Sequence, residues 1–165
     1  MTMTAATDDH VRALMAWFPD GRSCAIWGGP AFRYPFTEST FLADTRFRDL
    51  PSYVLLDEEG QVLAFGQYYK RAGRCHFGRL VVSPVLRGLG VGGRLIVDLA
   101  SMGTRRLGVD ECSLFVVADN APAIRLYERL GFAPAVYPED DPDVRAYVYM
   151  VVAARALDAS QSLPP

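Results

Sequence analysis

Four glycines lie within six residues of this chain, where a predicted strand passes into a predicted helix. The strand ends in the apolar run Leu80-Val81-Val82, and the loop that follows it contains Gly88, Gly90, Gly92 and Gly93. Glycine loses more conformational freedom on folding than any other residue. A loop so rich in glycine therefore predicts a backbone that turns sharply or that a ligand must approach closely.

The residues after the loop predict a helix over about 91–107. Val91, Leu95 and Leu99 recur on one face at helical spacing. The first backbone N–H groups of such a helix have no intrahelical acceptor, and glycines allow an anion to approach them directly. The segment is therefore predicted to bind a phosphate or a pyrophosphate.

Other phosphate-binding motifs fit this segment less well. Gly88, Gly90 and Gly93 match the spacing of the dinucleotide-binding fingerprint, but five residues separate Val82 from the first of these glycines. That fingerprint places its first glycine directly after the strand and an acidic residue at the end of the next strand. A P-loop is excluded because no Gly-Lys-Ser/Thr follows.

The rest of the chain predicts a mixed α/β fold in a single domain over 1–165, with a central, mostly antiparallel sheet flanked by helices. The N-terminal segment 8–50 is predicted to be mainly helical, the core to cover about 52–152, and the tail 155–165 to fray. The expected helices are 8–18, which Asp8 or Asp9 can cap, 37–47, whose capped start is offered by Thr37-Glu38-Ser39-Thr40, 91–107, and one capped by Asp119 or Asn120. The expected strands are 52–56, 61–70, 75–82, 111–117, 132–137 and 145–152. The stretch 26–36, with two prolines and two glycines, is predicted to be irregular.

Composition excludes several classes of function. The net charge of −2 provides no basic field for nucleic acid or an anionic membrane. No apolar run reaches the roughly 20 residues of a membrane span, and no signal peptide is evident, so a cytoplasmic protein is expected. Cys24, Cys75 and Cys112 form no metal-ligand spacing, so no metal site is predicted.

The glycine loop resembles the Arg/Gln-x-x-Gly-x-Gly/Ala motif of the GNAT acetyltransferases. Arg87-Gly88-Leu89-Gly90-Val91-Gly92 matches that motif, and Leu126-Tyr127-Glu128-Arg129-Leu130-Gly131-Phe132 resembles the family's Leu-Tyr-x-x-x-Gly-Phe. Asn120-Ala121-Pro122-Ala123 stands between them, after the strand predicted at 111–117. The resemblance covers roughly residues 52–152 and implies an N-acetyltransferase that uses acetyl-CoA without a metal.

The resemblance assigns roles to individual residues. The backbone of Leu80, Val81 and Val82 would bind the pantetheine arm and polarise the thioester carbonyl. Arg87, Gly88, Leu89, Gly90, Val91, Gly92 and Gly93 would wrap the pyrophosphate. Asn120 would contact the cofactor as well as cap a helix, and Tyr127 would protonate the departing CoA thiolate.

The general base is left open. Some family members carry a glutamate on the fifth strand, and the matching position is Phe115, which weakens an assignment to protein N-terminal acetylation. Histone-type members carry a glutamate on the fourth strand, and the matching position is His76, whose ordinary pKa suits a base. An ordinary strand histidine at a sheet face and proton removal through water are the alternatives.

The acceptor is predicted to be a primary amine of an unidentified small molecule or peptide, bound by a monomer or a homodimer. The family places the acceptor pocket between the N-terminal segment and the last two strands, where Trp27, Phe32, Tyr34 and Phe36 could line it. The loop Glu139-Asp140-Asp141 could attract a cationic amine, although such runs are often merely solvated. A non-catalytic acyl-CoA-binding module and an acyltransferase for a longer acyl chain or a hydroxyl acceptor are the alternative functions.

Overall fold

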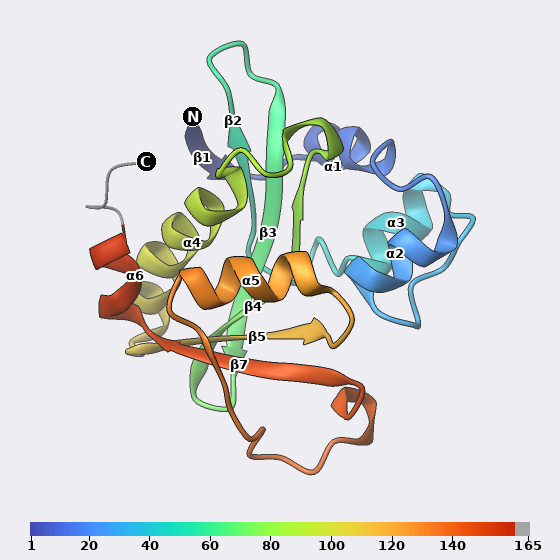
Figure 1. Ribbon diagram of the computed structural model, residues 1–165. Helices are drawn as coiled ribbons and strands as arrows, with labels where there is room; N and C mark the ends of the chain where they lie inside the picture. Colours follow the sequence, from blue (N-terminus) through green and yellow to red (C-terminus); the bar gives the residue numbers. More distant parts are fainter. Residues whose placement is uncertain (161–165) are drawn as a thin grey trace. The chain divides into compact units, whose positions relative to one another are not determined.

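The structure, a computed structural model, describes residues 1–160. Its sheet has seven strands in the order β1-β2-β3-β4-β5-β7-β6 (Figure 1). The strands are β1 Thr2–Ala5, β2 Ser52–Leu56, β3 Val62–Arg71, β4 Arg74–Val82, β5 Glu111–Val117, β6 Ala133–Pro134 and β7 Tyr147–Ala153. The helices are α1 Asp8–Met15, α2 Gly21–Gly28, α3 Glu38–Asp44, α4 Val91–Leu107, α5 Ala121–Arg129 and α6 Ala154–Ser160, with 3-10 turns at Pro84–Leu86 and Pro142–Val144. The predicted mixed α/β fold with a mostly antiparallel sheet is confirmed.

The chain forms two compact units, which we describe separately. The first comprises Met1–Gln67 and Arg79–Leu95, and the second comprises Tyr68–Gly78 and Ile96–Pro165. The single domain expected over 1–165 stays a prediction.

The N-terminal end of the first unit contains a strand that the sequence did not reveal. β1 pairs with β2 in antiparallel register from Thr2 opposite Leu56 to Ala5 opposite Tyr53. β2 in turn pairs antiparallel with β3. Four residues with two threonines give too short a pattern for prediction, so only the partner strand identifies β1.

Hydroxyl and carboxylate side chains begin the three N-terminal helices. Thr7, not Asp8 or Asp9 as predicted, caps α1 and forms a capping box with His10. Thr37 caps α3 as predicted, and Asp20 caps α2. Each cap satisfies N–H groups that a first helical turn leaves without an acceptor.

Helix α2 partly overturns the prediction of an irregular stretch over 26–36. It reaches Gly28, because both glycines stand at its C-terminal end and both prolines lie beyond it. Gly28 is needed there for packing, since an added Cβ would lie 2.2 Å from the Phe32 ring. Glycine and proline therefore mark where this helix stops.

Aromatic side chains dominate the core of the first unit. The rings of Trp27, Phe18 and Phe41 contact one another, with the Trp27 centroid 4.5 Å from that of Phe18 and 5.6 Å from that of Phe41. Phe32 is buried against the same rings, 5.3 Å from Phe41. The fully buried Phe65 adds an edge contact to Trp27 from β3. This cluster joins the helices to the strands of the unit.

The second unit is built on two buried strands. β4 pairs parallel with β5 from Cys75 opposite Cys112 to Phe77 opposite Leu114. β5 pairs antiparallel with β7 along its whole length. Gly103 of α4 permits close packing on β4, because an added Cβ would lie 2.5 Å from the Cys75 sulfur.

Two C-terminal predictions are corrected by the structure. β6 covers only Ala133–Pro134, not 132–137, because Pro134 has no N–H to donate to a strand ladder. α6 occupies Ala154–Ser160, where fraying was expected from 155. The side chain of Leu157 is fully buried, and its burial holds α6 against the rest of the protein. The predicted fraying of 161–165 lies outside the described residues.

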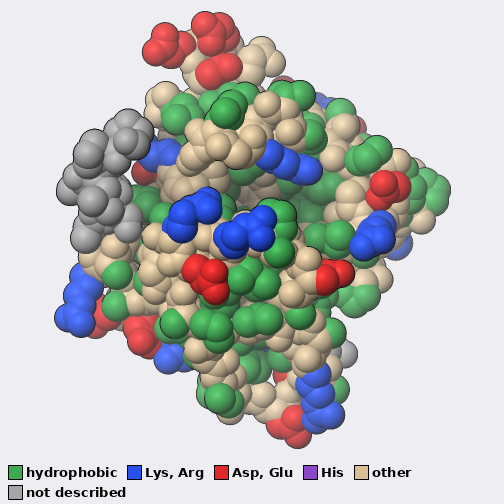
Figure 2. All heavy atoms as spheres, viewed as in Figure 1, with side chains coloured by type: hydrophobic (Ala, Val, Ile, Leu, Met, Phe, Trp, Pro, Cys, Tyr) green, Lys and Arg blue, Asp and Glu red, His purple; other side chains and the backbone are tan. Residues whose placement is uncertain are grey.

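The described surface is mixed in charge. Acidic and basic side chains are both spread over the face shown in Figure 2. Within residues 1–160, no helix combines the length and the hydropathy that crossing a membrane requires.

Candidate active site

The glycine loop has the backbone predicted for an anion site. Gly88 and Gly90 have φ values of +81° and +82°, a region that side-chain-bearing residues rarely adopt. An added Cβ at either glycine would meet no protein atom within 4 Å, so the space beside them is open. The glycines are thus required by the backbone conformation and not by crowding from the protein.

The loop delivers free donors at the start of α4. The N–H of Arg94 bonds to the carbonyl of Gly90 at 3.2 Å, which makes this the first bond of the helix. The four N–H groups from Gly90 to Gly93 therefore precede the helical hydrogen-bond ladder. Arg87 and Leu89 are exposed on the same loop. Together these groups favour an anionic ligand, assisted by the helix dipole.

Strand β4 leads into this loop. Its parallel pairing with β5 ends at Phe77, although β4 continues to Val82. Val81 is buried in the aromatic core, and Leu80 and Val82 are half-buried. A chemical role for the backbone groups of these three residues stays a prediction.

Asn120 and Tyr127 lie on α5 in the second unit. The Asn120 side chain caps the helix by accepting from the N–H of Ala123 at 3.4 Å, as predicted. Tyr127 is buried, its ring centroid 5.9 Å from that of Phe132. Burial raises the pKa of the Tyr127 hydroxyl to about 12, because the charged phenolate would be poorly solvated. The group therefore holds its proton at neutral pH.

His76 is enclosed on β4. It is 2% exposed, and its Nδ1 lies 2.9 Å from the hydroxyl oxygen of Ser113. The rings of Tyr69 and Phe115 lie 5.2 and 5.1 Å from the imidazole. Burial, and secondarily the charge of Arg71, lower the pKa of His76 to about 3. The histidine is therefore neutral across the physiological range.

Within the second unit, the Arg71 side chain contacts both β5 and the loop that follows β6. Its guanidinium carbon lies 5.0 Å from the Phe115 ring centroid and 5.2 Å from that of Tyr137. Its nitrogens donate to the Tyr137 hydroxyl at 2.9 Å and to Asp141 at 3.0 Å. The guanidinium of Arg71 therefore makes both cation–π contacts and charge-assisted hydrogen bonds.

A pocket of about 230 Å³ opens beside this cluster. Its walls include aromatic rings and carboxylates, with one exposed guanidinium; these are Phe115, Tyr137, Tyr147, Tyr149, Glu139, Asp140, Asp141 and Arg145. Asp140 pairs with Arg145, whereas Glu139 accepts a hydrogen bond from the Tyr137 hydroxyl at 2.7 Å. Because Arg71 pairs with Asp141 and Arg145 pairs with Asp140, the three carboxylates exceed the guanidinium groups here by one charge, which favours a cationic ligand.

The sequence did not single out several of these residues. Arg71 ends a strand before a turn, and Ser113 and Tyr149 lie within ordinary apolar strands, so no local pattern marks them. Only the alternation Tyr147-Val148-Tyr149 indicates that two tyrosines share one face of a strand.

The aromatic residues expected to line an acceptor pocket belong to the first unit. Trp27, Phe32 and Phe36 pack in or against its core. Tyr34 is 44% exposed and donates its hydroxyl hydrogen to the carbonyl of Pro19 at 2.8 Å. The structure thus gives three of the four a packing role. Among the described residues, no cluster of three or more His, Cys, Asp or Glu side chains could hold a metal ion.

Part of this chain is similar in sequence to mycothiol acetyltransferases. A mycothiol acetyltransferase of Acidothermus cellulolyticus is 54% identical over 54 residues, a match that covers 32% of this chain and 16% of that protein. The chain spans about one sixth of the length of the curated relatives it matches.

Solved structures share the fold over nearly the whole chain. The spermidine N-acetyltransferase of Vibrio cholerae, in complex with CoA and spermine, has a TM-score of 0.70 at 17% identity and covers 94% of this chain and 96% of that chain. An aminoglycoside acetyltransferase in complex with coenzyme A has a TM-score of 0.73 at 19% identity and covers 98% and 99%.

The family model for the acetyltransferase (GNAT) family matches residues 12–132, which include the glycine loop, Asn120 and Tyr127. This match extends over most of the sequence and agrees with the motifs on which the resemblance was based. The chain belongs to the acetyltransferase (GNAT) family.

Proposed function

We propose that this protein binds acetyl-CoA and transfers its acetyl group directly to a primary amine within a ternary complex. The observation that carries the proposal is the open space beside Gly88 and Gly90, next to the free N–H groups at the start of α4. These donors suit the pyrophosphate of CoA. Two structures with the same fold are CoA complexes, which supports this choice of anion.

Strand β4 is proposed to bind the rest of the donor. Among the described residues, the parallel register of β4 with β5 ends at Phe77, and this leaves backbone groups of Leu80–Val82 available to the pantetheine arm. One well-placed N–H donor on the developing oxyanion would stabilise the transition state by about 3 kcal/mol.

The proposed reaction makes one bond and breaks one. The amine nitrogen attacks the thioester carbonyl carbon, a C–N bond forms, and the C–S bond breaks as the thiolate leaves. Tyr127 would donate its proton to that thiolate, and its raised pKa keeps the proton available at neutral pH. Because a thiol of pKa about 8.5 is already a good leaving group, this acid assists the step without being indispensable.

The attacking amine must lose a proton, and His76 is a poor base for that task. Its conjugate acid has a pKa of about 3, far below that of an amine, and its Nδ1 already faces Ser113. These properties favour a structural role for His76. We therefore propose that a relay of water molecules carries the proton out to bulk solvent, with no dedicated residue as the base.

The proposed acceptor is a cationic amine held in the pocket between the loop after β6 and strand β7. Aromatic faces and carboxylates attract ammonium groups, and this pocket contains both. The two structures with the same fold are a spermidine and an aminoglycoside acetyltransferase, which supports an amine with several positive charges.

The test has two stages. Titration calorimetry with acetyl-CoA and CoA measures donor binding, and free-thiol release with mass spectrometry then identifies products from a panel of polyamines, aminoglycosides, amino acids and peptides. Binding of acetyl-CoA together with thiol release by a polycationic amine is the expected result. Parallel reactions with propionyl- and succinyl-CoA test the donor.

Other outcomes lead to different conclusions. Absence of binding by folded protein would overturn the proposal entirely. Binding without thiol release for any acceptor would instead identify a regulatory acyl-CoA-binding module. Release confined to the longer acyl donors would replace acetyl transfer by another acyl transfer.

A further inference from the structure

Arg79 has an unusual backbone conformation in the middle of β4. Its φ is +51°, a value that residues other than glycine and asparagine adopt only when their surroundings compensate for the steric strain. The next three residues are Leu80, Val81 and Val82, the proposed thioester-binding segment. The strained residue thus directly precedes the backbone groups to which we assign chemistry.

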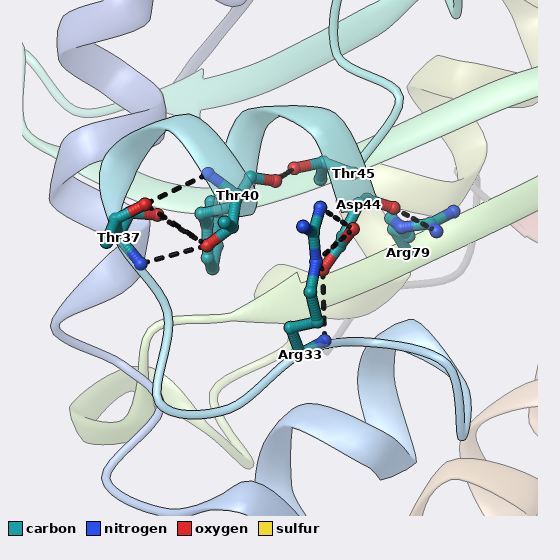
Figure 3. A network of polar contacts seen from close by, with 7 residues as sticks. Arg33, Thr37, Thr40, Asp44, Thr45 and Arg79 are labelled. Carbon is teal, nitrogen blue, oxygen red and sulfur yellow. Dashed lines mark hydrogen bonds and ion pairs between the residues drawn. The ribbon is translucent and has the colours of Figure 1, made fainter.

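The side chain of Arg79 is anchored at the end of α3. Its Nη2 donates to the backbone carbonyl of Asp44 at 2.5 Å (Figure 3). Asp44 is the last residue of α3, and carbonyls at a helix C-terminus lack intrahelical donors and carry partial negative charge. A guanidinium therefore interacts favourably with this position.

Asp44 is itself held firmly by Arg33. The Asp44 carboxylate accepts from the Arg33 side chain at 2.9 and 2.6 Å and from its backbone N–H at 3.0 Å. These hydrogen bonds lower the pKa of Asp44, and its side chain is only 15% exposed. Two planar groups locked in this way form a stiff support for the carbonyl that Arg79 binds (Figure 3).

On one edge, β4 is hydrogen-bonded to β3, its neighbour in the sheet. On the other edge, the register with β5 ends at Phe77, before Arg79. After it, Val81 packs into the aromatic core, and the Ser83 N–H bonds to the Leu63 carbonyl at 2.9 Å. The positive φ of Arg79 turns the backbone between these points, and it therefore contributes to the direction of the N–H groups that follow.

We propose that Arg79 is a positioning residue: by binding the end of α3, it sets the β4 backbone so that an N–H group of Leu80–Val82 polarises the acetyl-CoA carbonyl. This inference rests on the proposed function. Preorganised donors stabilise an oxyanion because they need not reorient during the reaction. Arg33 and Asp44 support the same geometry from the N-terminal segment.

The test uses Arg79→Gly, Arg79→Lys and a matched control. Glycine adopts φ of +51° without strain, so Arg79→Gly removes the anchor while the backbone stays allowed. Ala72→Gly is the control, because Ala72 has a φ of +48° in the turn between β3 and β4 and gains the same freedom. Each variant is measured for its urea unfolding, its kcat and KM, and the infrared carbonyl stretch of bound acetyl-CoA labelled with 13C at the thioester.

In the wild-type complex we expect the carbonyl stretch to shift to lower frequency than in free acetyl-CoA. In Arg79→Gly, most of this frequency shift should disappear. The kcat should fall by about 10- to 100-fold, a loss typical of a small misplacement of a catalytic group, here the N–H donor. The KM for acetyl-CoA should change little, since the glycine loop is intact. Arg79→Lys should retain part of the carbonyl frequency shift and part of the kcat. Ala72→Gly should match the wild type in both quantities.

Three results would overturn the inference. If the wild type transfers acetyl groups and both Arg79 variants keep its kcat and carbonyl frequency, Arg79 does not position the strand, although the proposed function stands. Should Arg79→Gly lose only unfolding free energy, the same conclusion holds. A wild type that does not bind acetyl-CoA would overturn both proposals. If Arg79→Gly fails to fold, Arg79→Lys decides the question, because it keeps the charge but lacks the planar guanidinium. A partial loss of the frequency shift and of kcat supports the inference, and wild-type values for both overturn it.

Discussion

The Nδ1 atom of His76 lies 2.9 Å from the hydroxyl oxygen of Ser113, across the parallel pairing of β4 and β5. Both residues are buried, and aromatic rings of Tyr69 and Phe115 enclose the imidazole. A histidine in such a setting contributes a neutral hydrogen bond to the fold. Its protonation is therefore coupled to unfolding.

The pH dependence of stability tests this role of His76. Its pKa is 6.5 in the unfolded chain and about 3 in the folded protein, so between these values only the unfolded state binds the proton. The group thus leaves stability unchanged above the unfolded pKa and lowers it by at most about 1.4 kcal/mol per pH unit as the pH falls below it. Urea unfolding of the wild type and His76→Gln measures the difference. Parallel curves for the two proteins from neutral pH down to about pH 4.5 would show that His76 protonates in the folded state.

Gly90 tests the glycine loop against a matched turn. Gly90 and Gly60 have φ values of +82° and +79°, and an added Cβ at either position meets nothing within 4 Å. Valine should therefore cost each variant a similar unfolding free energy, about 1–2 kcal/mol. Only Gly90→Val should weaken acetyl-CoA binding, by more than about tenfold, because its side chain occupies the space left for the pyrophosphate. Calorimetry that finds the same Kd for both variants would contradict a pyrophosphate site here.

Tyr127→Phe tests the proposed acid. The ring stays packed against Phe132, so the fold and the KM for acetyl-CoA should persist. The kcat should fall by about 10- to 100-fold, near the lower end of general acid catalysis, because the thiolate leaves readily. Since Tyr127 has a pKa of about 12, its ionisation should not lower the activity of the wild type up to about pH 10. An unchanged kcat in Tyr127→Phe would exclude the residue as the acid.

Glu139→Gln tests the acceptor pocket. Glutamine can still accept the hydrogen bond from the Tyr137 hydroxyl, while the negative charge is removed. The KM for a cationic acceptor should rise about two- to fivefold, as expected for one exposed charge, and the KM for acetyl-CoA should stay constant. Glu58→Gln, in the exposed turn between β2 and β3, is the charge-matched control. Equal effects of the two substitutions would mean that the pocket does not bind the acceptor.

Gly103→Ala tests the close contact of α4 with β4. The new Cβ would lie 2.5 Å from the Cys75 sulfur and 3.1 Å from the Tyr68 ring, and such overpacking costs about 1–3 kcal/mol of unfolding free energy. Cys75→Ala should reduce that cost in the double variant, because the sulfur is removed. Denaturation of the four proteins of this cycle measures the coupling. Strictly additive losses would show that the contact does not exist.

Local pattern predicted much of this fold. The helix over 91–107 and the strand over 111–117 have the predicted bounds, because apolar spacing and a following glycine or turn define both from adjacent residues. The same holds for the caps at Thr37 and Asn120, where a side chain bonds to N–H groups three residues away. The glycine motif likewise identified the family, since its conformational requirement lies in the backbone of a few consecutive residues.

Tertiary structure decided what depends on partners remote in sequence. β1 exists because β2 pairs with it, and α6 continues past the predicted frayed point because Leu157 is buried. The contact of Arg71 with Tyr137 spans 66 residues, and that of Arg79 with Asp44 spans 35, so no local pattern could reveal them. Sequence alone determined where the chain can turn, cap and expose its backbone. Burial and charge at His76, Arg79 and the acceptor pocket depend on which distant side chains surround them, and only the folded chain sets those neighbours.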